Sequence, residues 1–227
     1  MLEKIVLVIA SVFLPASVSF AGNFDVGLNY AAGISEKKGL NTSFDIQEGS
    51  FSLSGGFKYS KQDGKTSQDN LGLSLGYDAN LGGKWALWMF NFSEYDRVQK
   101  INFENSFGAG PKYTFINSKN LVLSFSGGPM QYHADYETAK SRNSLRLSGR
   151  FKMGWIISPD MRFNVLSFYQ PNLADHKDYL TRTMADLSHT ITKTVSLKLK
   201  LEDYYRSRTE AQKHNDFSST LALSVNF

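Results

Sequence analysis

The feature that most constrains the fold of this chain is a long succession of segments whose hydrophobic residues recur at every second position. In one of them, Leu71, Leu73, Leu75 and Tyr77 alternate with small or polar residues. Successive side chains of a β-strand point to opposite faces, so each segment predicts a strand with one apolar face. Helical periodicity is hard to find after the first 22 residues. Twelve strands are predicted: 23–34, 40–47, 50–59, 69–80, 85–92, 101–115, 121–136, 144–157, 161–171, 179–191, 194–205 and 216–227.

The connectors between these strands alternate between two kinds. Short turns are expected at 48–49, 81–84, 116–119, 158–160 and 192–193, and longer, more charged loops at 35–39, 60–68, 93–100, 137–143, 172–178 and 206–215. Short turns at one rim and longer loops at the other are typical of a transmembrane barrel, whereas a soluble sandwich has no reason to sort its loops. We therefore predict an all-β, antiparallel transmembrane β-barrel of about 12 strands, with both termini at the periplasmic rim. The turn at Glu48-Gly49 decides the count, because one long strand over 40–59 would make it odd.

The two ends of the chain indicate the bacterial outer membrane. The last strand places Phe217, Leu221, Leu223, Val225 and Phe227 on one face and ends on an aromatic residue. Such an ending looks like the assembly signal of outer-membrane barrels, so Phe227, Val225 and Leu223 are expected to engage the barrel-assembly machinery.

The first 21 residues are typical of a secretory signal peptide. A short charged start is followed by a mostly apolar run over 5–14 and a small-x-small pattern ending at Ala21. The run is too short for a transmembrane helix. We predict cleavage after Ala21, with residues 1–21 as signal peptide and 22–227 as a barrel embedded in outer-membrane lipid. The alternative is a buried N-terminal strand.

Composition excludes several classes of protein. The chain has no cysteine, so it has no disulfide framework and no thiolate metal site. Its net charge of +4 is spread along the sequence, with no basic block that would argue for binding nucleic acid. A soluble periplasmic β protein has a compatible composition and stays open as an alternative.

The strand over 144–157 indicates which faces point inward. Arg146, Arg150 and Lys152 share one face, opposite a face of Leu, Phe, Met and Trp residues. Unpaired charges are costly in a dry core, so these cations are expected to face a wet lumen. The same phase turns further cations (Lys58, Lys112, Arg162, Arg182, Lys198, Lys200) and the acids Asp78, Glu104, Asp186 and Glu202 inward. The expected lumen is net basic.

A basic lumen has two interpretations. In the first, Arg146, Arg150, Lys152, Arg162 and Arg182 set the selectivity of a narrow pore for small anionic solutes. In the second, the cations pair with Asp and Glu side chains and the interior is filled. Aromatic residues near the strand ends are expected to form interfacial girdles: Trp85, Trp88, Tyr113, Phe115, Trp155, Tyr169, Tyr204 and Tyr205.

Catalytic constellations were weighed because some outer-membrane barrels modify lipids. None of the four histidines lies in a His-x-Ser pattern on a strand, which would place a nucleophile and its base on one face. His133 with Asp135 and His214 with Asp216 each share a face and could form half of an acid–base pair, although a solvated polar pair explains them as well. No catalytic residue, cofactor or metal is predicted.

Several motifs resemble a known family over residues 22–227. They include Asn91-Phe-Ser-Glu-Tyr-Asp-Arg97, Phe107-Gly-Ala-Gly-Pro-Lys-Tyr113, Gly127-Gly-Pro129, Arg146-Leu-Ser-Gly-Arg150 and Tyr169-Gln-Pro-Asn172. In order and spacing they resemble the salt-induced outer-membrane protein family, a domain of unknown function. A Gly-Asn-Thr turn usual in that family appears here only as Gly39-Leu-Asn-Thr42. The resemblance implies an outer-membrane barrel induced by salt stress and supplies no agreed activity.

The sequence thus predicts a non-enzymatic barrel with a structural or stress-related role in the cell envelope. Two alternatives remain: a narrow, anion-preferring channel for small solutes, and a lipid-modifying enzyme of the outer membrane.

Overall fold

The computed structural model describes residues 21–31, 37–208 and 214–226, and within these ranges the chain forms twelve β-strands. No helix in the described part of the chain is long and apolar enough to cross a membrane. The strands are β1 (Ala21–Ala31), β2 (Lys37–Glu48), β3 (Phe51–Gln62), β4 (Lys65–Gly82), β5 (Trp85–Asp96), β6 (Ile101–Asn117), β7 (Leu121–Tyr136), β8 (Arg142–Ser158), β9 (Met161–Pro171), β10 (Tyr179–Thr190), β11 (Val195–Arg206) and β12 (Asn215–Asn226).

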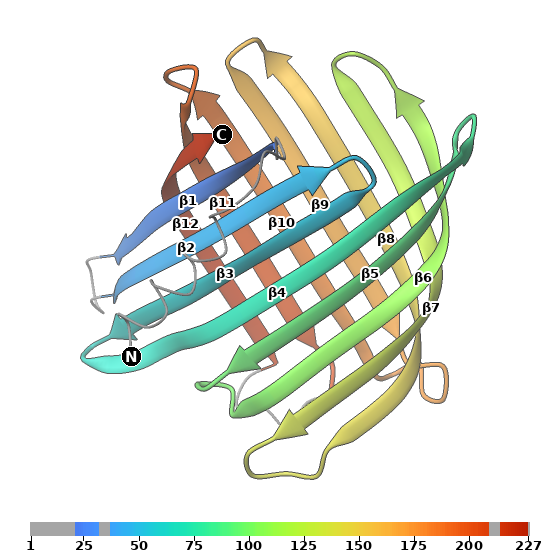
Figure 1. Cartoon of the computed structure of the whole chain (residues 1–227). Helices are drawn as coiled ribbons and strands as arrows, with labels where there is room; N and C mark the ends of the chain where they lie inside the picture. Colours follow the sequence, from blue (N-terminus) through green and yellow to red (C-terminus); the bar gives the residue numbers. More distant parts are fainter. Residues whose placement is uncertain (1–20, 32–36, 209–213, 227) are drawn as a thin grey trace, which may run out of the picture.

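The strands close into one antiparallel barrel (Figure 1). Each strand pairs with its neighbours in sequence, and β1 pairs with β12 to complete the ring. This seam joins Asn23–Leu28 to Leu221–Asn226 through six residue pairs, against eleven between β1 and β2. Closure removes the free edges that an open sheet would expose, so the backbone groups of the described strands are paired within the wall.

The twelve predicted strands are confirmed, including the turn that decides the count. Gly49 has a positive φ of 56° and reverses the chain between β2 and β3. The long loop predicted over 60–68 is wrong. β3 and β4 run on to a tight hairpin turn at Asp63-Gly64, where both residues have positive φ. Asp-Gly is a strong signal for such a turn, although the polar residues on both sides of it are equally typical of a loop.

The outer face of the barrel is apolar. Leu71, Leu73 and Leu75 on β4 are 45–55% exposed, and Leu221 and Leu223 on β12 are each 54% exposed. In water such a surface would be costly, whereas in a membrane it faces lipid. A closed barrel with this exterior belongs in the bacterial outer membrane.

Aromatic residues gather near the ends of the strands, as predicted. The end of the barrel with the short turns, such as those at 49–50 and 159–160, is called the turn end, and the opposite end the loop end. At the turn end, Trp85 packs against Tyr113 and Tyr113 against Phe115, with ring centroids 4.8 and 4.9 Å apart. At the loop end, Tyr179 lies 5.7 Å from Tyr169 and 5.8 Å from Tyr205. These groups fit the two interfacial girdles of a membrane barrel.

The girdle prediction is wrong for Trp88 and Tyr204. Trp88 is 2% exposed and packs against lumen residues, and the Tyr204 hydroxyl donates a hydrogen bond to Glu104. Both occupy the inward phase of their strands, which proximity to a strand end does not reveal.

The predicted signal peptide and the terminal aromatic lie outside the described residues. Residues 1–20 and Phe227 are not described, and Ala21 is the first residue of β1. Val225 and Leu223 lie on the outer face of β12, 47% and 54% exposed.

Candidate functional site: the barrel lumen

The inward phase of the strands carries charged residues of both signs, with more acids than the sequence analysis expects. Asp25 on β1, Asp45 on β2 and Glu94 on β5 share the inward phase, and Arg206 on β11 joins the cations. The lumen therefore holds a smaller excess of positive charge than the sequence analysis gave. Alternation could have found Asp25 and Asp45, which lie within predicted strands, whereas Glu94 and Arg206 fall in segments predicted as loops, because β5 and β11 run further than expected.

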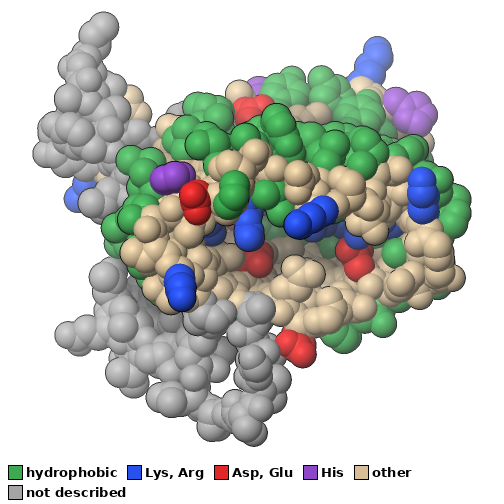
Figure 2. Space-filling view, turned by 90° about the horizontal axis from the view of Figure 1, so that it is seen from above, with side chains coloured by type: hydrophobic (Ala, Val, Ile, Leu, Met, Phe, Trp, Pro, Cys, Tyr) green, Lys and Arg blue, Asp and Glu red, His purple; other side chains and the backbone are tan. Residues whose placement is uncertain are grey.

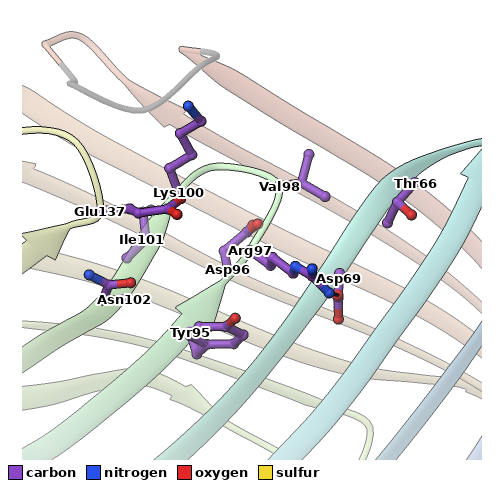
Figure 3. A pocket seen from close by; sticks show the side chains of 10 residues that line it. All are labelled: Thr66, Asp69, Tyr95, Asp96, Arg97, Val98, Lys100, Ile101, Asn102 and Glu137. Carbon is purple, nitrogen blue, oxygen red and sulfur yellow. Dashed lines mark ion pairs between the residues drawn. The ribbon is translucent and has the colours of Figure 1, made fainter.

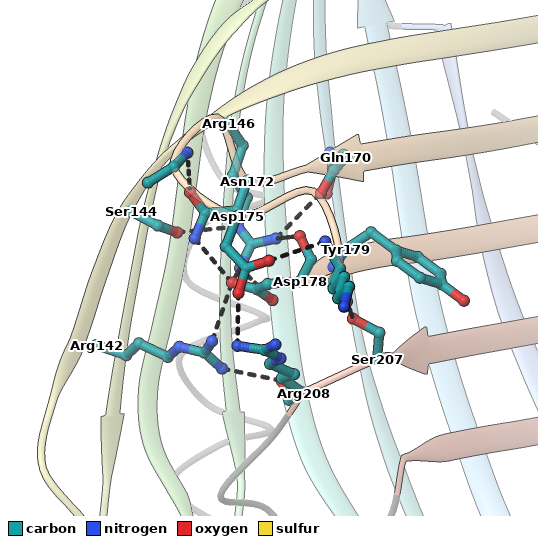
Figure 4. Close-up of polar contacts among 12 residues, drawn as sticks. Arg142, Ser144, Arg146, Gln170, Asn172, Asp175, Asp178, Tyr179, Ser207 and Arg208 are labelled. Atoms are coloured by element: carbon teal, nitrogen blue, oxygen red, sulfur yellow. Dashed lines mark hydrogen bonds and ion pairs between the residues drawn. The ribbon is translucent and has the colours of Figure 1, made fainter.

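The loop end is closed by a buried ion pair (Figure 4). Arg146 of β8 is 0% exposed and its Nη2 donates to both carboxylate oxygens of Asp178, at 3.1 and 2.9 Å. Its Nη1 donates to the backbone carbonyls of Gln170 and Asp178, and the Tyr132 ring lies 4.7 Å from its Cζ. The N–H donors of Arg146 are thus all engaged inside the protein, and none is left to bind a solute.

Asp178 joins the long loops to the wall. It lies between β9 and β10, is 1% exposed, and also accepts hydrogen bonds from Arg142 and Asn172, both at 2.9 Å. The hydroxyl of Ser207 links the next loop by accepting from the Tyr179 N–H and donating to the Lys177 carbonyl. Sequence alternation could not reveal this partner, because a loop residue has no strand phase.

Below this closure the lumen holds a small apolar core. Met130, Tyr132, Ala134 and Tyr136 occupy the inward face of β7 and are at most 5% exposed. Ile101 of β6 and Leu180 of β10 complete the cluster. Buried apolar side chains exclude water, so this half of the lumen is packed.

Two clusters of charged side chains, one around Glu104 and one around Glu202, occupy the middle of the lumen. Glu104 accepts hydrogen bonds from Arg206 at 3.0 Å and from the Tyr204 hydroxyl at 2.5 Å. Glu202 forms ion pairs with Lys58 and Arg182, the latter at 2.5 Å. Beside them Lys58, Asn70, Glu94, Glu202 and Tyr204 help to line a cavity of about 10 Å³, which is the space of about one water molecule.

The half of the lumen near the short turns is more open. Figure 2 looks onto this end from above and shows Lys and Arg side chains, with Asp and Glu side chains among them, around a hollow. Asp25 pairs with Lys198 at 3.1 Å and with Lys200, and Asp78 pairs with Lys112 at 2.6 Å. The Asp186 carboxylate accepts from Asn164 at 3.1 Å.

Three cations on the wall of this hollow differ from the others. Arg150 and Lys152 of β8 and Arg162 of β9 have no carboxylate within ion-pair distance in the described part of the chain. Lys58, Lys112, Arg146, Arg182, Lys198, Lys200 and Arg206 each have one. Asp45 and Asp186 are the nearby acids without a cation partner, so these three cations leave the turn end net positive.

A second cavity, of about 510 Å³, lies at the loop-end rim between β4 and β7 (Figure 3). Its lining contains three acidic residues, Asp69, Asp96 and Glu137, and two basic residues, Arg97 and Lys100. The Asp96 carboxylate accepts the Gln99 N–H at 2.8 Å, and Arg97 lies 3.9 Å from Asp69. These contacts stabilise the turn between β5 and β6, and the lining carries no dominant charge.

The histidine pairs weighed for catalysis do not form. His133 Nδ1 bonds the Asn143 side chain at 2.8 Å, while Asp135 accepts from Ser141. His214 Nδ1 bonds the Arg206 carbonyl. Among the described residues, no group of three or more His, Asp or Glu side chains could hold a metal ion.

Comparisons with known proteins agree with this architecture. The model of the family described as "Protein of unknown function, DUF481" matches residues 24–227. The solved NanC porin is similar with a TM-score of 0.55 and 12% identity, over 90% of this chain and 98% of that one. The KdgM porin in complex with disordered oligogalacturonate is similar with a TM-score of 0.50 and 11% identity, over 90% and 99%. At these identities the likeness concerns the fold, and no curated protein matches the chain.

Proposed function

Because the chain belongs to the DUF481 family of proteins of unknown function and forms an outer-membrane barrel, we propose that it is an anion-preferring channel for small solutes whose loop end is closed in this structure. The proposal makes a non-enzymatic role the leading one.

One observation carries the proposal: Arg150, Lys152 and Arg162 line the turn-end hollow without carboxylate partners. A pore wall with uncompensated positive charge raises the local concentration of anions and repels cations. The neighbouring acids Asp45 and Asp186 offset part of this field, so a preference rather than exclusive selectivity is expected.

The loop end decides whether a solute passes. Among the described residues, Arg146, Asp178 and the apolar cluster fill much of that half of the lumen, and the cavity beside Glu202 has room for about one water molecule. Conduction therefore requires the 172–178 loop to leave its site on Arg146. If the loop never leaves this site, no solute passes and the barrel has a structural role. This role is the second candidate function, and the buried ion pairs favour it.

The printed title of one similar structure is consistent with an anionic solute. The KdgM porin was solved with oligogalacturonate, an acidic polymer. We propose the same charge class for this chain, on the strength of its own lumen cations.

Conductance of the purified barrel in planar bilayers tests the proposal. We expect reversal potentials in a salt gradient to show anion preference, and the double variant Arg150→Glu/Lys152→Glu to reverse it. Lys119→Glu, an exposed residue of the β6–β7 turn, is the matched control because it adds a negative charge at the same end outside the lumen.

The closed state is tested in parallel with Asp178→Ala, which removes the partner of Arg146. We expect a larger conductance with the anion preference retained. An absence of conductance in both proteins would contradict the channel and leave the structural barrel.

Three further proposals concern the processing, membrane assembly and expression of the protein. We propose cleavage after Ala21, testable by sequencing the N-terminus of the mature protein. Recognition of the last strand by the assembly machinery predicts poor outer-membrane recovery after deletion of Phe227. Induction by salt, which the resemblance implies, predicts more transcript at raised NaCl.

A further inference from the structure

We propose that Arg150 is the centre of a binding site for a carboxylate-bearing organic acid that enters from the turn end of the lumen. The inference deepens the channel proposed above and rests on it for the route by which the solute arrives. Arg150 lies near the middle of β8, at the inner end of the hollow that holds Lys152 and Arg162.

Aromatic rings hold the guanidinium of Arg150 in place. Its Cζ lies 5.4 Å from the Trp88 ring centroid and 5.9 Å from that of Phe168. Trp88 is in turn stacked on Phe90 at 4.8 Å, and Phe90 lies 6.1 Å from Phe168. A guanidinium held by cation–π contacts has already lost part of its rotational freedom, so binding an anion costs it less further entropy.

The donors of this guanidinium are unused. Nε is buried without a hydrogen-bond partner, and no hydrogen bond or ion pair engages the terminal nitrogens within the described residues. Three other lumen arginines, Arg146, Arg182 and Arg206, each bind a carboxylate. A half-buried cation without a counterion is costly, so an anion placed there gains from both charge and hydrogen bonding.

Neighbouring cations extend the positive region around Arg150. Lys152 is the next inward residue on β8. In the strand register, Ser126 of β7 lies opposite both Lys112 of β6 and Arg150 of β8, so Lys112 is two strands away from Arg150 at the same level. Asp78 neutralises Lys112. Arg150 and Lys152 together therefore present two positive charges to a solute in the hollow.

The chemistry of the site favours an organic acid over a bare ion. The planar fork of a guanidinium matches the two oxygens of a carboxylate. The half-buried Phe168 ring beside it offers an apolar surface for the carbon skeleton that carries the acid. Phosphate shares the charge but lacks such a skeleton, and a neutral sugar lacks the charge.

Trp88 provides a direct reporter. The chain has three tryptophans, and Trp85 and Trp155 lie on the outer face. In the variant Trp85→Phe/Trp155→Phe, the emission of Trp88 is measured while glucuronate, citrate, inorganic phosphate or glucose is added to the folded barrel in detergent at constant ionic strength. We expect a saturable change with glucuronate and citrate, weaker binding of phosphate, and none with glucose.

Substitutions of Arg150 decide the assignment. We expect Arg150→Gln to weaken binding by about tenfold or more, as for loss of a charge-assisted hydrogen bond. Arg150→Lys should weaken it less, because the charge stays while the fork is lost, and it serves if the glutamine variant does not fold. Lys193→Gln, in the exposed β10–β11 turn, should leave binding unchanged.

Several results would overturn the inference. They are a glucuronate titration without saturation, saturation that survives Arg150→Gln, or phosphate binding as tightly as glucuronate. The outcome is separable from that of the channel: saturable binding without conductance keeps the site and removes the channel, and anion-selective conductance without saturable binding does the reverse.

Discussion

Replacing Asp178 by alanine should destabilise the barrel more than any comparable change in its loops. The substitution leaves the guanidinium of Arg146 at 0% exposure without its carboxylate, and also removes acceptors from Arg142 and Asn172. Removing one partner of a buried ion pair costs about 3–5 kcal/mol, because the remaining charge loses its counterion and the structure around it must open before water can hydrate it. We expect the free energy of unfolding to fall by about that amount.

Asp175→Ala is the matched control. Asp175 lies in the same loop and pairs with Arg208, but the two side chains are 37% and 51% exposed. An exposed pair contributes about 0.2–1 kcal/mol, so the control should lose no more than this.

The assay is reversible urea unfolding in lipid vesicles, followed by tryptophan emission. The double variant Arg146→Met/Asp178→Leu replaces the pair by apolar groups, and we expect it to recover most of the lost stability. Equal small losses for Asp178→Ala and Asp175→Ala would refute the claim that the buried pair holds the loop end closed.

Three further predictions concern closure, wall packing and ion preference. Val26 and Leu223 are paired across the seam in a chain without cysteine, so Val26→Cys/Leu223→Cys should form a disulfide that non-reducing electrophoresis detects; no disulfide under oxidising conditions would contradict the closed ring. A Cβ added at Gly128 would lie 2.0 Å from the Ala109 carbonyl oxygen, whereas a Cβ added at Gly127 would lie 3.3 Å from its nearest atom. Gly128→Ala should therefore lower the yield of folded, heat-modifiable barrel far more than Gly127→Ala. Equal yields of the two variants would be inconsistent with this close approach. Glu202→Gln removes the acid that Lys58 and Arg182 share, so the anion-to-cation permeability ratio should rise, and an unchanged ratio would show that Glu202 does not face the ion path.

The sequence predicts the wall of this barrel well because one rule governs it. Strands such as β4 and β12 must show lipid one face and the lumen the other, so alternation alone gives their number, phase and order. The rule also places Arg150, Lys152, Arg162, Arg182, Lys198, Lys200, Glu104 and Asp186 on the inward phase, where the structure has them.

The pairing inside the lumen is harder to predict. Lys58 and Glu202 are 144 positions apart in sequence, and their contact depends on the barrel's diameter and stagger rather than on local pattern. Arg146 finds its partner in a loop, and Trp88 takes the inward phase although it lies near a strand end. Alternation therefore identifies which residues enter the lumen, while only the closed geometry separates the paired cations from Arg150, Lys152 and Arg162.

The most direct test of the account measures from which end the lumen is open. In this cysteine-free chain, Lys152→Cys places a single thiol in the turn-end hollow. We expect rapid reaction with a membrane-impermeant thiol reagent in the purified barrel, no reaction from outside in intact cells, and reaction from outside once Asp178→Ala is added. Rapid labelling from outside without that second change, or no labelling of the purified barrel, would contradict a lumen that is open at the turns and closed at the loops.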